Sequence, residues 1–439
     1  MRTRQRCLRR ARARVLRSRA GQAVLVISGA TVLAQIIAIA AVPILTRLYS
    51  PKEYGAFFIV NSLSLALAAG LAMRLELAIP LPLDDDDARN LVTLAAAAIA
   101  LMLLGVTTAS LIWSRAMASA LALPGSPWIV LLVGPLAASF ALFAVLNAVA
   151  VRERRFSAIA RRQLVVAALT VALQLVAGLV GGGVSGLAIS TLVAQLMGVA
   201  SLCVGSPLMA RRFATTRAQL LRILRRYASF PLLLAPAGWL NSLGSNAPLL
   251  VVGALYATDA AGWFGLTLRI VALPAAFVGT AIAQVYLSEL ALRRRELAGT
   301  ERALFLKTST ILSVAAVLFG GALILVGPWA FGIVFGPEWA PAGDMARAYA
   351  LAASAQILAS PVSATLIIYE RVVIQIVWDA SRLLLTIGSL IVAWSLHASV
   401  VNAVWALSVV TALCYAANWE LCRRTVMRRQ KREAPFISV

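Results

Sequence analysis

Residues 163–208, QLVVAALTVALQLVAGLVGGGVSGLAISTLVAQLMGVASLCVGSPL, contain no charged side chain, and glycines 181–183 divide them into two apolar runs. An α-helix of about 20 apolar residues crosses the hydrocarbon core of a bilayer, which is about 30 Å thick. The stretch therefore predicts two membrane spans, 163–181 and 184–208, joined by a short turn.

Arginine pairs lie just outside both ends of this predicted hairpin. Arg161 and Arg162 precede it, and Arg211 and Arg212 follow it, whereas the glycine turn carries no charge. Lys and Arg collect in the cytoplasmic connections of membrane proteins. Both ends of the hairpin are therefore expected in the cytoplasm, with the turn on the opposite side.

The same pattern extends along the whole chain of 439 residues. Hydrophobic residues make up 61%, charged residues only 13%, and the mean hydropathy is +0.88, which excludes an ordinary soluble domain. The sequence predicts an all-α polytopic membrane protein of about twelve transmembrane helices. The ten further spans are expected near 22–43, 54–80, 89–112, 127–150, 229–254, 260–288, 305–328, 343–368, 372–396 and 399–421.

Positive charge alternates between the predicted connections. Of the 40 Lys and Arg residues, 33 fall on the side of the two termini, and only Arg47, Lys52, Arg115 and Arg347 fall on the other. This bias predicts that the N- and C-termini are both cytoplasmic. The basic leader, Arg2 to Arg19, precedes a span too long for a signal peptide and is expected to be retained.

An internal repeat predicts two lobes of six helices. LYSPKEYGAF at 48–57 resembles LYATDAAGWF at 255–264, and the offset of 207 residues corresponds to six spans. An even number of spans makes the halves parallel repeats. The expected segments are a basic cytoplasmic N-terminal segment 1–21, an N-lobe 22–208, a basic cytoplasmic linker 209–228, a C-lobe 229–422 and a basic cytoplasmic tail 423–439.

Local chemistry accounts for the start of the helix in the first copy. Ser50 and Glu53 have the spacing of a capping box, and Pro51 suits the first helical position. Gly55 and Gly262 are expected to allow close helix packing. The run Asp84 to Asp87 is read as a solvated cytoplasmic turn that also starts the third span.

The net charge of +23 is explained by blocks next to the spans, where they fix topology and contact anionic lipid headgroups. Nucleic acid is therefore not an expected partner. The four cysteines and the single histidine, His397, have no metal-ligand spacing, so no metal or cofactor is predicted. The expected outer connections are short and lack a P-loop, GxSxG or HExxH motif, so the protein is not expected to be an enzyme.

Four segments resemble the Wzx-type O-antigen flippases, bacterial polysaccharide exporters of the MOP superfamily. They are AVPILTRLYSPKEYGAFFIV at 41–60, MRLELAIPLPLDDDDARN at 73–90, FPLLLAPAGWLNSLGSNAPLLVVGALYATDAAGWFGLTLRIVALP at 230–274 and VFGPEWAPAG at 334–343. Together they cover about a fifth of the residues, and their order along the chain carries the resemblance.

The resemblance implies a multi-pass protein of the bacterial inner membrane. Its substrate would be an undecaprenyl-diphosphate-linked oligosaccharide repeat, flipped by alternating access through a cationic cavity for O-antigen, capsule or exopolysaccharide assembly. A polysaccharide polymerase and chain-length machinery are further partners that it implies. The residues do not distinguish among the three pathways.

Charged residues inside predicted spans are the first candidates for the cavity, because a charge at mid-bilayer costs at least about 2.5 kcal/mol. Arg269 has no acidic residue within one helical turn. Arg74 and Glu76 are two positions apart, about 200° around a helix, so they are not expected to pair directly. Asp379 and Arg382 are three positions apart and can neutralise each other.

Neutral polar residues in the spans can either line a glycan path or bond between helices, at around 0.6 kcal/mol on average for such a bond. Asn241, Gln35 and Gln284 are the neutral candidates for the cavity. Two other functions stay open. One is a cation-coupled exporter of small molecules with the same fold, although the span 22–43 has no acidic residue; the other is a non-transporting membrane component of a glycan-assembly complex.

Overall fold

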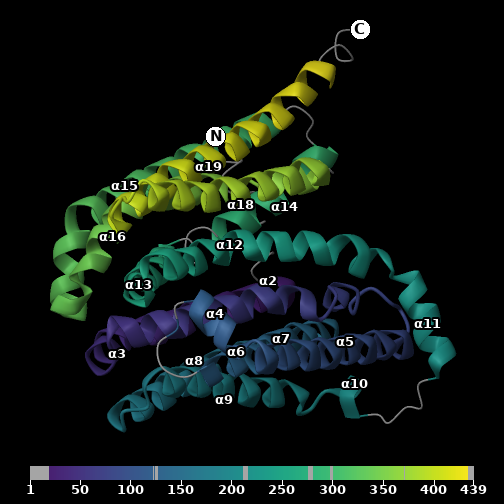
Figure 1. The fold of residues 1–439 in the computed structure, drawn as a ribbon. Coiled ribbons are helices and arrows are strands. Elements are labelled where there is room, and N and C mark those ends of the chain that lie inside the picture. The colour runs from purple at the N-terminus through teal and green to yellow at the C-terminus, as the bar shows by residue number, and fades with distance from the viewer. Residues whose placement is uncertain are drawn as a thin grey trace. The chain divides into compact units, whose positions relative to one another are not determined.

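The computed structural model describes residues 19–121, 123, 127–210, 216–274, 280–296, 300–369 and 371–433. Within these residues the regular structure is helical, as predicted (Figure 1). The elements are α2 (Arg19–Ala40), α3 (Val42–Leu48), α4 (Pro51–Leu71), η1 (Leu75–Leu77), α5 (Asp85–Ile112), α6 (Ser114–Ala120), η2 (Pro127–Leu132), α7 (Val133–Arg152), α8 (Phe156–Leu179), α9 (Gly183–Cys203), α10 (Pro207–Ala210), α11 (Arg217–Arg226), η3 (Phe230–Leu234), α12 (Ala235–Tyr256), α13 (Thr258–Pro274), α14 (Thr280–Glu296), α15 (Glu301–Phe335), η5 (Pro337–Trp339), α16 (Ala340–Ala359), α17 (Ala364–Ile368), α18 (Val372–Ser395) and α19 (Val400–Glu433). Most of the basic leader lies outside the described residues.

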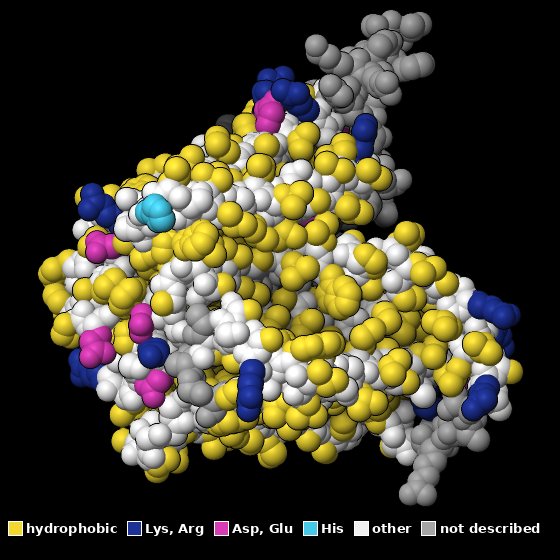
Figure 2. Space-filling model, in the orientation of Figure 1, with side chains coloured by type: hydrophobic (Ala, Val, Ile, Leu, Met, Phe, Trp, Pro, Cys, Tyr) yellow, Lys and Arg dark blue, Asp and Glu magenta, His cyan; other side chains and the backbone are white. Residues whose placement is uncertain are grey.

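Nine helical segments of the described chain are long and apolar enough to cross a membrane. They do not include α12, α13 and α16, which lie where the sequence predicts spans seven, eight and ten. Figure 2 shows hydrophobic side chains over broad areas of the surface, with charged side chains in small separate groups. Exposed apolar surface on this scale fits contact with lipid, and the protein is a multi-pass membrane protein.

The helices form two compact units. The first contains Met1–Leu45, Ser64–Ser114 and Trp128–Gly238; the second contains Thr46–Leu63, Arg115–Pro127 and Trp239–Val439. Helix α4 is divided between them, because its first part packs with α13 and its last part with the helices that follow it along the chain.

In the first unit, α7 packs against α5 and α9, and α8 packs against α2 and α9. Its main apolar core contains Leu71, Leu75, Leu91, Val145 and Ile223, together with other buried residues of the same helices. Burial of this kind stabilises at roughly 25 cal/mol for each Å² of apolar surface where the alternative is water. In lipid, close van der Waals packing and hydrogen bonds replace that driving force.

In the second unit, α16 packs against α13, α15 and α19, and α18 packs against α19. The turn between α15 and α16 lies within VFGPEWAPAG at 334–343, between the predicted spans 305–328 and 343–368. Gly336 has a φ of 105°, a conformation that L side chains rarely adopt, and this ends α15. Pro337 then begins the short helix η5, as a residue without a backbone N–H can.

The predicted start of α4 is confirmed in detail. The Ser50 backbone N–H donates to the Glu53 carboxylate over 2.9 Å, and the Glu53 backbone N–H donates to the Ser50 hydroxyl over 3.3 Å. Pro51 occupies the first helical position. The pair is a reciprocal capping box, so two otherwise unpaired N–H groups at the end of a helix are satisfied.

Candidate functional site

Three of the predicted cavity residues come together inside the second unit. Arg382 and Asp379 lie on α18, one turn apart, and Asn241 lies on α12. Arg382 Nη2 is 3.6 Å from Asp379 Oδ1 and donates to Asn241 Oδ1 over 3.4 Å. Arg382 Nη1 donates to the Tyr415 hydroxyl over 3.1 Å, which brings in α19 as well.

This Arg382 cluster is closed by aromatic rings and by a glycine. The guanidinium carbon of Arg382 lies 5.0 Å from the ring centre of Trp378 and 5.9 Å from that of Tyr415, within the range of a cation–π interaction. A Cβ atom at Gly244 would lie 3.0 Å from Arg382 Nη2. The absence of a side chain there lets α12 approach the guanidinium closely.

Two atoms of the Arg382 cluster make no hydrogen bond, although one of them, Asp379 Oδ1, belongs to the ion pair. Arg382 Nε and Asp379 Oδ1 are buried without a hydrogen-bond partner, while the other carboxylate oxygen accepts a bond of 3.2 Å from Gln375. The side chains of Arg382 and Asp379 are 9% and 11% exposed. A buried guanidinium with a spare N–H can bind a phosphate or carboxylate oxygen. The predicted pairing of Asp379 with Arg382 is confirmed.

The expectation that Arg74 and Glu76 do not pair was wrong. Arg74 Nη1 is 3.5 Å from Glu76 Oε1. The expectation assumed an unbroken helix, but α4 ends at Leu71, and Met73 and Arg74 have φ angles of 52° and 56°. The chain therefore turns between the two residues, and a separation of 200° around a helix no longer applies.

Because α4 ends at Leu71, Glu76 lies outside the candidate span, in the short helix η1. Burial raises the pKa of the Glu76 carboxyl above its ordinary value, and the charge of Arg74 acts against this rise. Arg74 lies against Gly238, also in the first unit, where an added Cβ would overlap its guanidinium. Gly238 thus gives Arg74 the room to reach this position.

Arg269 also lies in the second unit. It is half-buried on α13 and interacts electrostatically with Tyr54 on α4. The Tyr54 ring makes an edge contact with Trp339, at 5.6 Å between ring centres, and packs against Phe58 at 5.2 Å. The repeat motif of residues 48–57 therefore places an aromatic group beside the predicted cation.

Trp339 anchors this aromatic group. Its ring is 1% exposed, and its indole N–H donates to the carbonyl oxygen of Thr46 over 3.0 Å. Trp339→Phe keeps most of the ring and removes the donor, so it should cost about 1 kcal/mol of stability, the usual net value of one hydrogen bond. A shift in the unfolding temperature of the purified protein in detergent would measure this. An unchanged temperature would contradict a stabilising bond.

The two copies of the repeat meet each other inside the second unit. An added Cβ at Gly55 would overlap the carbonyl oxygen of Thr258, and one at Gly262 would overlap the carbonyl oxygen of Pro51. Pro51 and Thr258 are themselves separated by the repeat offset of 207 residues. The contact between α4 and α13 is thus reciprocal, as across a two-fold axis. The predicted close packing at both glycines is confirmed.

The neutral candidates differ in their surroundings. Asn241 belongs to the Arg382 cluster, Gln35 is exposed on α2, and the side chain of Gln284 lies outside the described residues. Two other glutamines in the spans bond between helices: Gln174 donates to Thr191 over 3.2 Å, and Gln195 accepts from Arg162. These two glutamines therefore form hydrogen bonds between helices, which is one of the two roles predicted for neutral polar residues in the spans.

Sequence reasoning missed Arg162 by assigning it to a cytoplasmic connection. It lies in the second turn of α8 and is 6% exposed, with its guanidinium carbon 3.4 Å from the ring centre of Phe143. Gly198 on α9 makes room for it, because an added Cβ would lie 2.9 Å from its Nε. The predicted span began at residue 163, where the charge-free run begins, and therefore excluded Arg162 by one residue.

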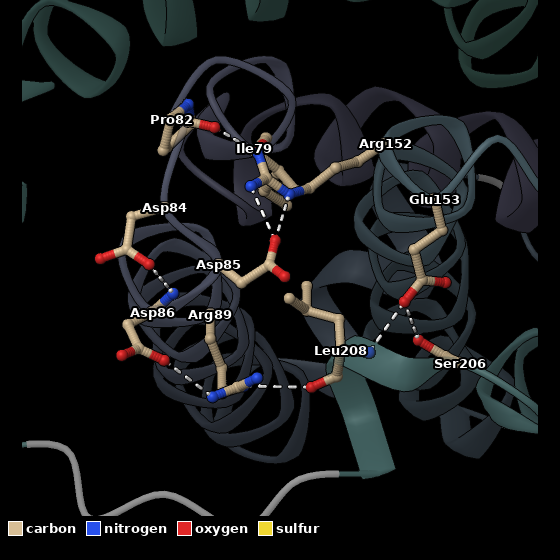
Figure 3. A network of polar contacts seen from close by, with 10 residues as sticks. All are labelled: Ile79, Pro82, Asp84, Asp85, Asp86, Arg89, Arg152, Glu153, Ser206 and Leu208. Carbon is tan, nitrogen blue, oxygen red and sulfur yellow. Dashed lines mark hydrogen bonds and ion pairs between the residues drawn. The ribbon is translucent and has the colours of Figure 1, made fainter.

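The acidic run does lie at the start of α5, as expected, and Asp84 caps this helix, but the run is more than a solvated turn. Asp85 pairs with Arg152 over 2.8 Å, and Asp86 pairs with Arg89 over 3.2 Å (Figure 3). Asp87 pairs with two arginines of α11. Asp85 and Asp87 therefore join α5 to α7 and α11 within the first unit, whereas the Asp86 pair lies within α5.

A cavity of about 610 Å³ lies beside this network, bordered by Pro80, Pro82, Leu83, Asp85, Val151, Arg152, Glu153, Pro207 and Leu208. Most of the charged groups that line it form ion pairs with one another or hydrogen bonds to the backbone. Arg152 donates to the carbonyl oxygens of Ile79 and Pro82, and Glu153 accepts from Ser206 and from the Leu208 N–H (Figure 3). The network fixes the loop before α5 in place.

Residues 44–344 match the family described as "Polysaccharide biosynthesis protein". No curated protein sequence matches the chain.

Solved structures of MOP-superfamily transporters are similar along nearly the whole chain. An inward-facing multidrug resistance MATE family transporter is 16% identical, with 91% of this chain and 96% of that chain covered and a TM-score of 0.74. The lipid II flippase MurJ, in an inward closed conformation, is 12% identical, with 94% and 93% covered and a TM-score of 0.72. A MOP transporter from Pyrococcus furiosus is 15% identical, with 94% and 97% covered and a TM-score of 0.63.

These similarities are to transporters and flippases rather than enzymes, and at such low identity the structural ones establish the fold. The family match spans more than half of the chain. The protein therefore belongs to the polysaccharide biosynthesis protein family and has the fold of the MOP-superfamily transporters.

Proposed function

We propose that this protein flips a polyprenyl-diphosphate-linked oligosaccharide across the bacterial inner membrane for the assembly of a surface polysaccharide. The observation that carries the proposal is the combination of a polysaccharide biosynthesis family with a transporter fold. The similarity to a lipid II flippase supports a lipid-linked substrate. We also propose the topology expected from the sequence, in which both termini lie in the cytoplasm and the helices form two parallel six-helix lobes.

The Arg382 cluster supports an anionic substrate. Arg382 lies in the middle of the candidate span Val373–Ser395, where a charged side chain costs at least about 2.5 kcal/mol. A charge at this depth normally pairs with another charge or faces a cavity, and Arg382 is paired with Asp379. Its spare Nε donor fits an oxygen of a diphosphate or of an acidic sugar, and Arg269 is a second candidate cation in the same unit. Arg74, in the first unit, stays a predicted candidate for contact with the substrate.

A cation-coupled exporter of small molecules is the second candidate, and the similarity to a MATE transporter favours it. Such an antiporter needs a membrane carboxylate free to bind the coupling ion. Asp379, in the candidate span Val373–Ser395, is 3.6 Å from Arg382, and α2 contains no acidic residue. Glu76, just outside a candidate span, is 3.5 Å from Arg74. The paired carboxylates therefore favour the flippase over the exporter.

The test of the proposal is a host lacking the gene, in which lipid-linked oligosaccharides are extracted and quantified. The flippase predicts that a complete lipid-linked repeat accumulates on the cytoplasmic side, and that the surface polysaccharide is lost. Restoring the wild-type gene should reverse both effects. An unchanged lipid-linked pool and surface polysaccharide, with increased drug sensitivity, would instead support the exporter.

A further inference from the structure

Helix α12 carries a polar segment within the second unit. Residues 241–246, NSLGSN, include two asparagines and two serines, and α12 is not among the nine segments of the described chain that are candidate spans. Arg382, in the middle of the candidate span Val373–Ser395, donates to Asn241, so these two residues lie at a similar depth. The polar segment is therefore expected well inside the bilayer.

The contact with Arg382 fixes the orientation of the Asn241 amide. A guanidinium group has N–H donors and no acceptor, so the amide must turn its oxygen toward Arg382. The two N–H groups of the amide then point away from the guanidinium. Asn241 is exposed, and within the described residues its side chain makes no other hydrogen bond.

The free N–H groups of Asn241 indicate that this face of α12 is in contact with water. An unsatisfied polar group is costly in hydrocarbon, whereas polar groups at membrane depth are tolerated where they line a water-filled space. Ser245 is exposed on the same face, since a step of four residues turns a helix by only about 40°. Asn241 and Ser245 thus form a strip that faces water, the α12 strip.

The α12 strip offers neutral donors and acceptors beside a cation. Asn241 has two free donors, and the Ser245 hydroxyl donates to the backbone oxygen of Asn241 over 3.1 Å and keeps its lone pairs as acceptors. Helix α12 contains no charged residue. Sugar hydroxyls both donate and accept hydrogen bonds, so the strip suits a sugar, whereas a phosphate oxygen suits the Arg382 guanidinium.

We propose that the α12 strip binds the sugar that is joined to the diphosphate of the lipid-linked oligosaccharide. This inference rests on the proposed function, with the diphosphate next to Arg382. The Asn241 amide oxygen is 3.4 Å from Arg382 Nη2, and four residues rise about 6 Å along a helix, so a sugar next to the phosphate reaches Ser245. The strip thereby recognises the first sugar of the substrate in addition to its charge.

Thiol labelling of the full-length protein in lipid nanodiscs tests whether the α12 strip faces water. Each variant carries a single cysteine, with the four native cysteines replaced by alanine. Ser245→Cys should react with a charged, water-soluble methanethiosulfonate at least about tenfold faster than Val317→Cys, because an apolar environment disfavours the reactive thiolate. Val317 is the control, since it is 72% exposed in the candidate span Glu301–Phe335 and is expected to face lipid. Equal rates would overturn the proposal.

Protection of Ser245→Cys from labelling tests the assignment of the sugar. One probe is the lipid-linked oligosaccharide extracted from the host that lacks the gene, and the other is undecaprenyl diphosphate, which carries no sugar. The oligosaccharide at concentration [L] should slow labelling by a factor of 1 + [L]/Kd, and undecaprenyl diphosphate should leave the rate unchanged. Equal protection by both probes would place the diphosphate at the strip and overturn the assignment, and so would the absence of protection by either.

Asn241→Asp, combined with Ser245→Cys, removes the two donors and keeps an oxygen that accepts from Arg382. It should weaken protection by the oligosaccharide roughly tenfold, the effect of losing one or two hydrogen bonds. Asn246→Asp is the matched control, because it adds the same charge to α12 at a residue whose amide donates to the Ser242 backbone oxygen over 2.9 Å. Protection should stay near that of the parent variant, and an equal loss in both variants would contradict a role for the Asn241 donors.

Failure of the sugar assignment differs from failure of the proposed function. If the oligosaccharide accumulates in the deletion host but does not protect Ser245→Cys, the flippase stands and the sugar assignment fails. If no lipid-linked oligosaccharide accumulates in that host, the flippase fails and the sugar assignment fails with it.

Discussion

Arg382→Ala should stop transport of the lipid-linked oligosaccharide and should also lower the stability of the protein. Removing one partner of a buried ion pair leaves the other charge uncompensated, which typically costs 3–5 kcal/mol. Asp379 would be that charge, at 11% exposure on α18. Surface polysaccharide and the lipid-linked pool, measured in the complemented deletion host, report on transport, and the unfolding temperature in detergent reports on stability.

The double variant Arg382→Gln with Asp379→Asn separates these two effects. Both replacements are neutral and nearly isosteric, so the uncompensated charge disappears and most of the stability should return. Transport should not return, because the cation that is proposed to meet the substrate is still missing. Recovery of transport together with stability would show that the pair is structural.

Arg347→Gln provides the matched control for the loss of one positive charge. Arg347 is an exposed residue of α16. We expect it to lie near the outer end of a span, where its long side chain can reach the aqueous surface. We expect nearly normal transport and a change in stability below about 0.5 kcal/mol, the usual range for surface substitutions.

The sequence was sufficient to predict helical membrane spans, because uncharged runs and the neighbouring arginines are local features. It did not predict where α4 ends. The residues after Leu71 include no glycine or proline before Pro80, yet Met73 and Arg74 adopt positive φ angles. A backbone turn of this kind is set by tertiary contacts, such as that of Arg74 with Gly238, and not by local propensity.

For the candidate site, the sequence could predict only what lies on one helix. The spacing of Asp379 and Arg382 predicted their pairing, and the repeat predicted close packing at two glycines. The contacts of Arg382 with Asn241 and Tyr415 join α18 to α12 and α19. Helix α12 lies more than 100 residues before α18 in the chain, and α19 follows α18 directly. No spacing in a single sequence predicts which side chains of these three helices meet, so their meeting point is known only from the fold.

Gly55→Ala should destabilise the second unit, because the new methyl group would overlap the Thr258 carbonyl oxygen and lie 2.8 Å from the Gly262 nitrogen. Both obstacles are backbone atoms, which a change of side-chain rotamer does not move. Overpacking of this kind costs typically about 1–3 kcal/mol. Gly262→Ala should have a similar effect through the carbonyl oxygen of Pro51, and both should lower the unfolding temperature in detergent.

The double variant tests whether the two glycines share one contact. If the first methyl group separates α4 from α13, the second meets less resistance, so the double effect should be smaller than the sum of the single effects. Gly321→Ala in α15 is the control, since an added Cβ there has no atom within 4 Å. It should stabilise the helix by up to about 1 kcal/mol. Additive effects at Gly55 and Gly262 would show that each glycine acts alone, and the two-fold contact would then carry no shared energy.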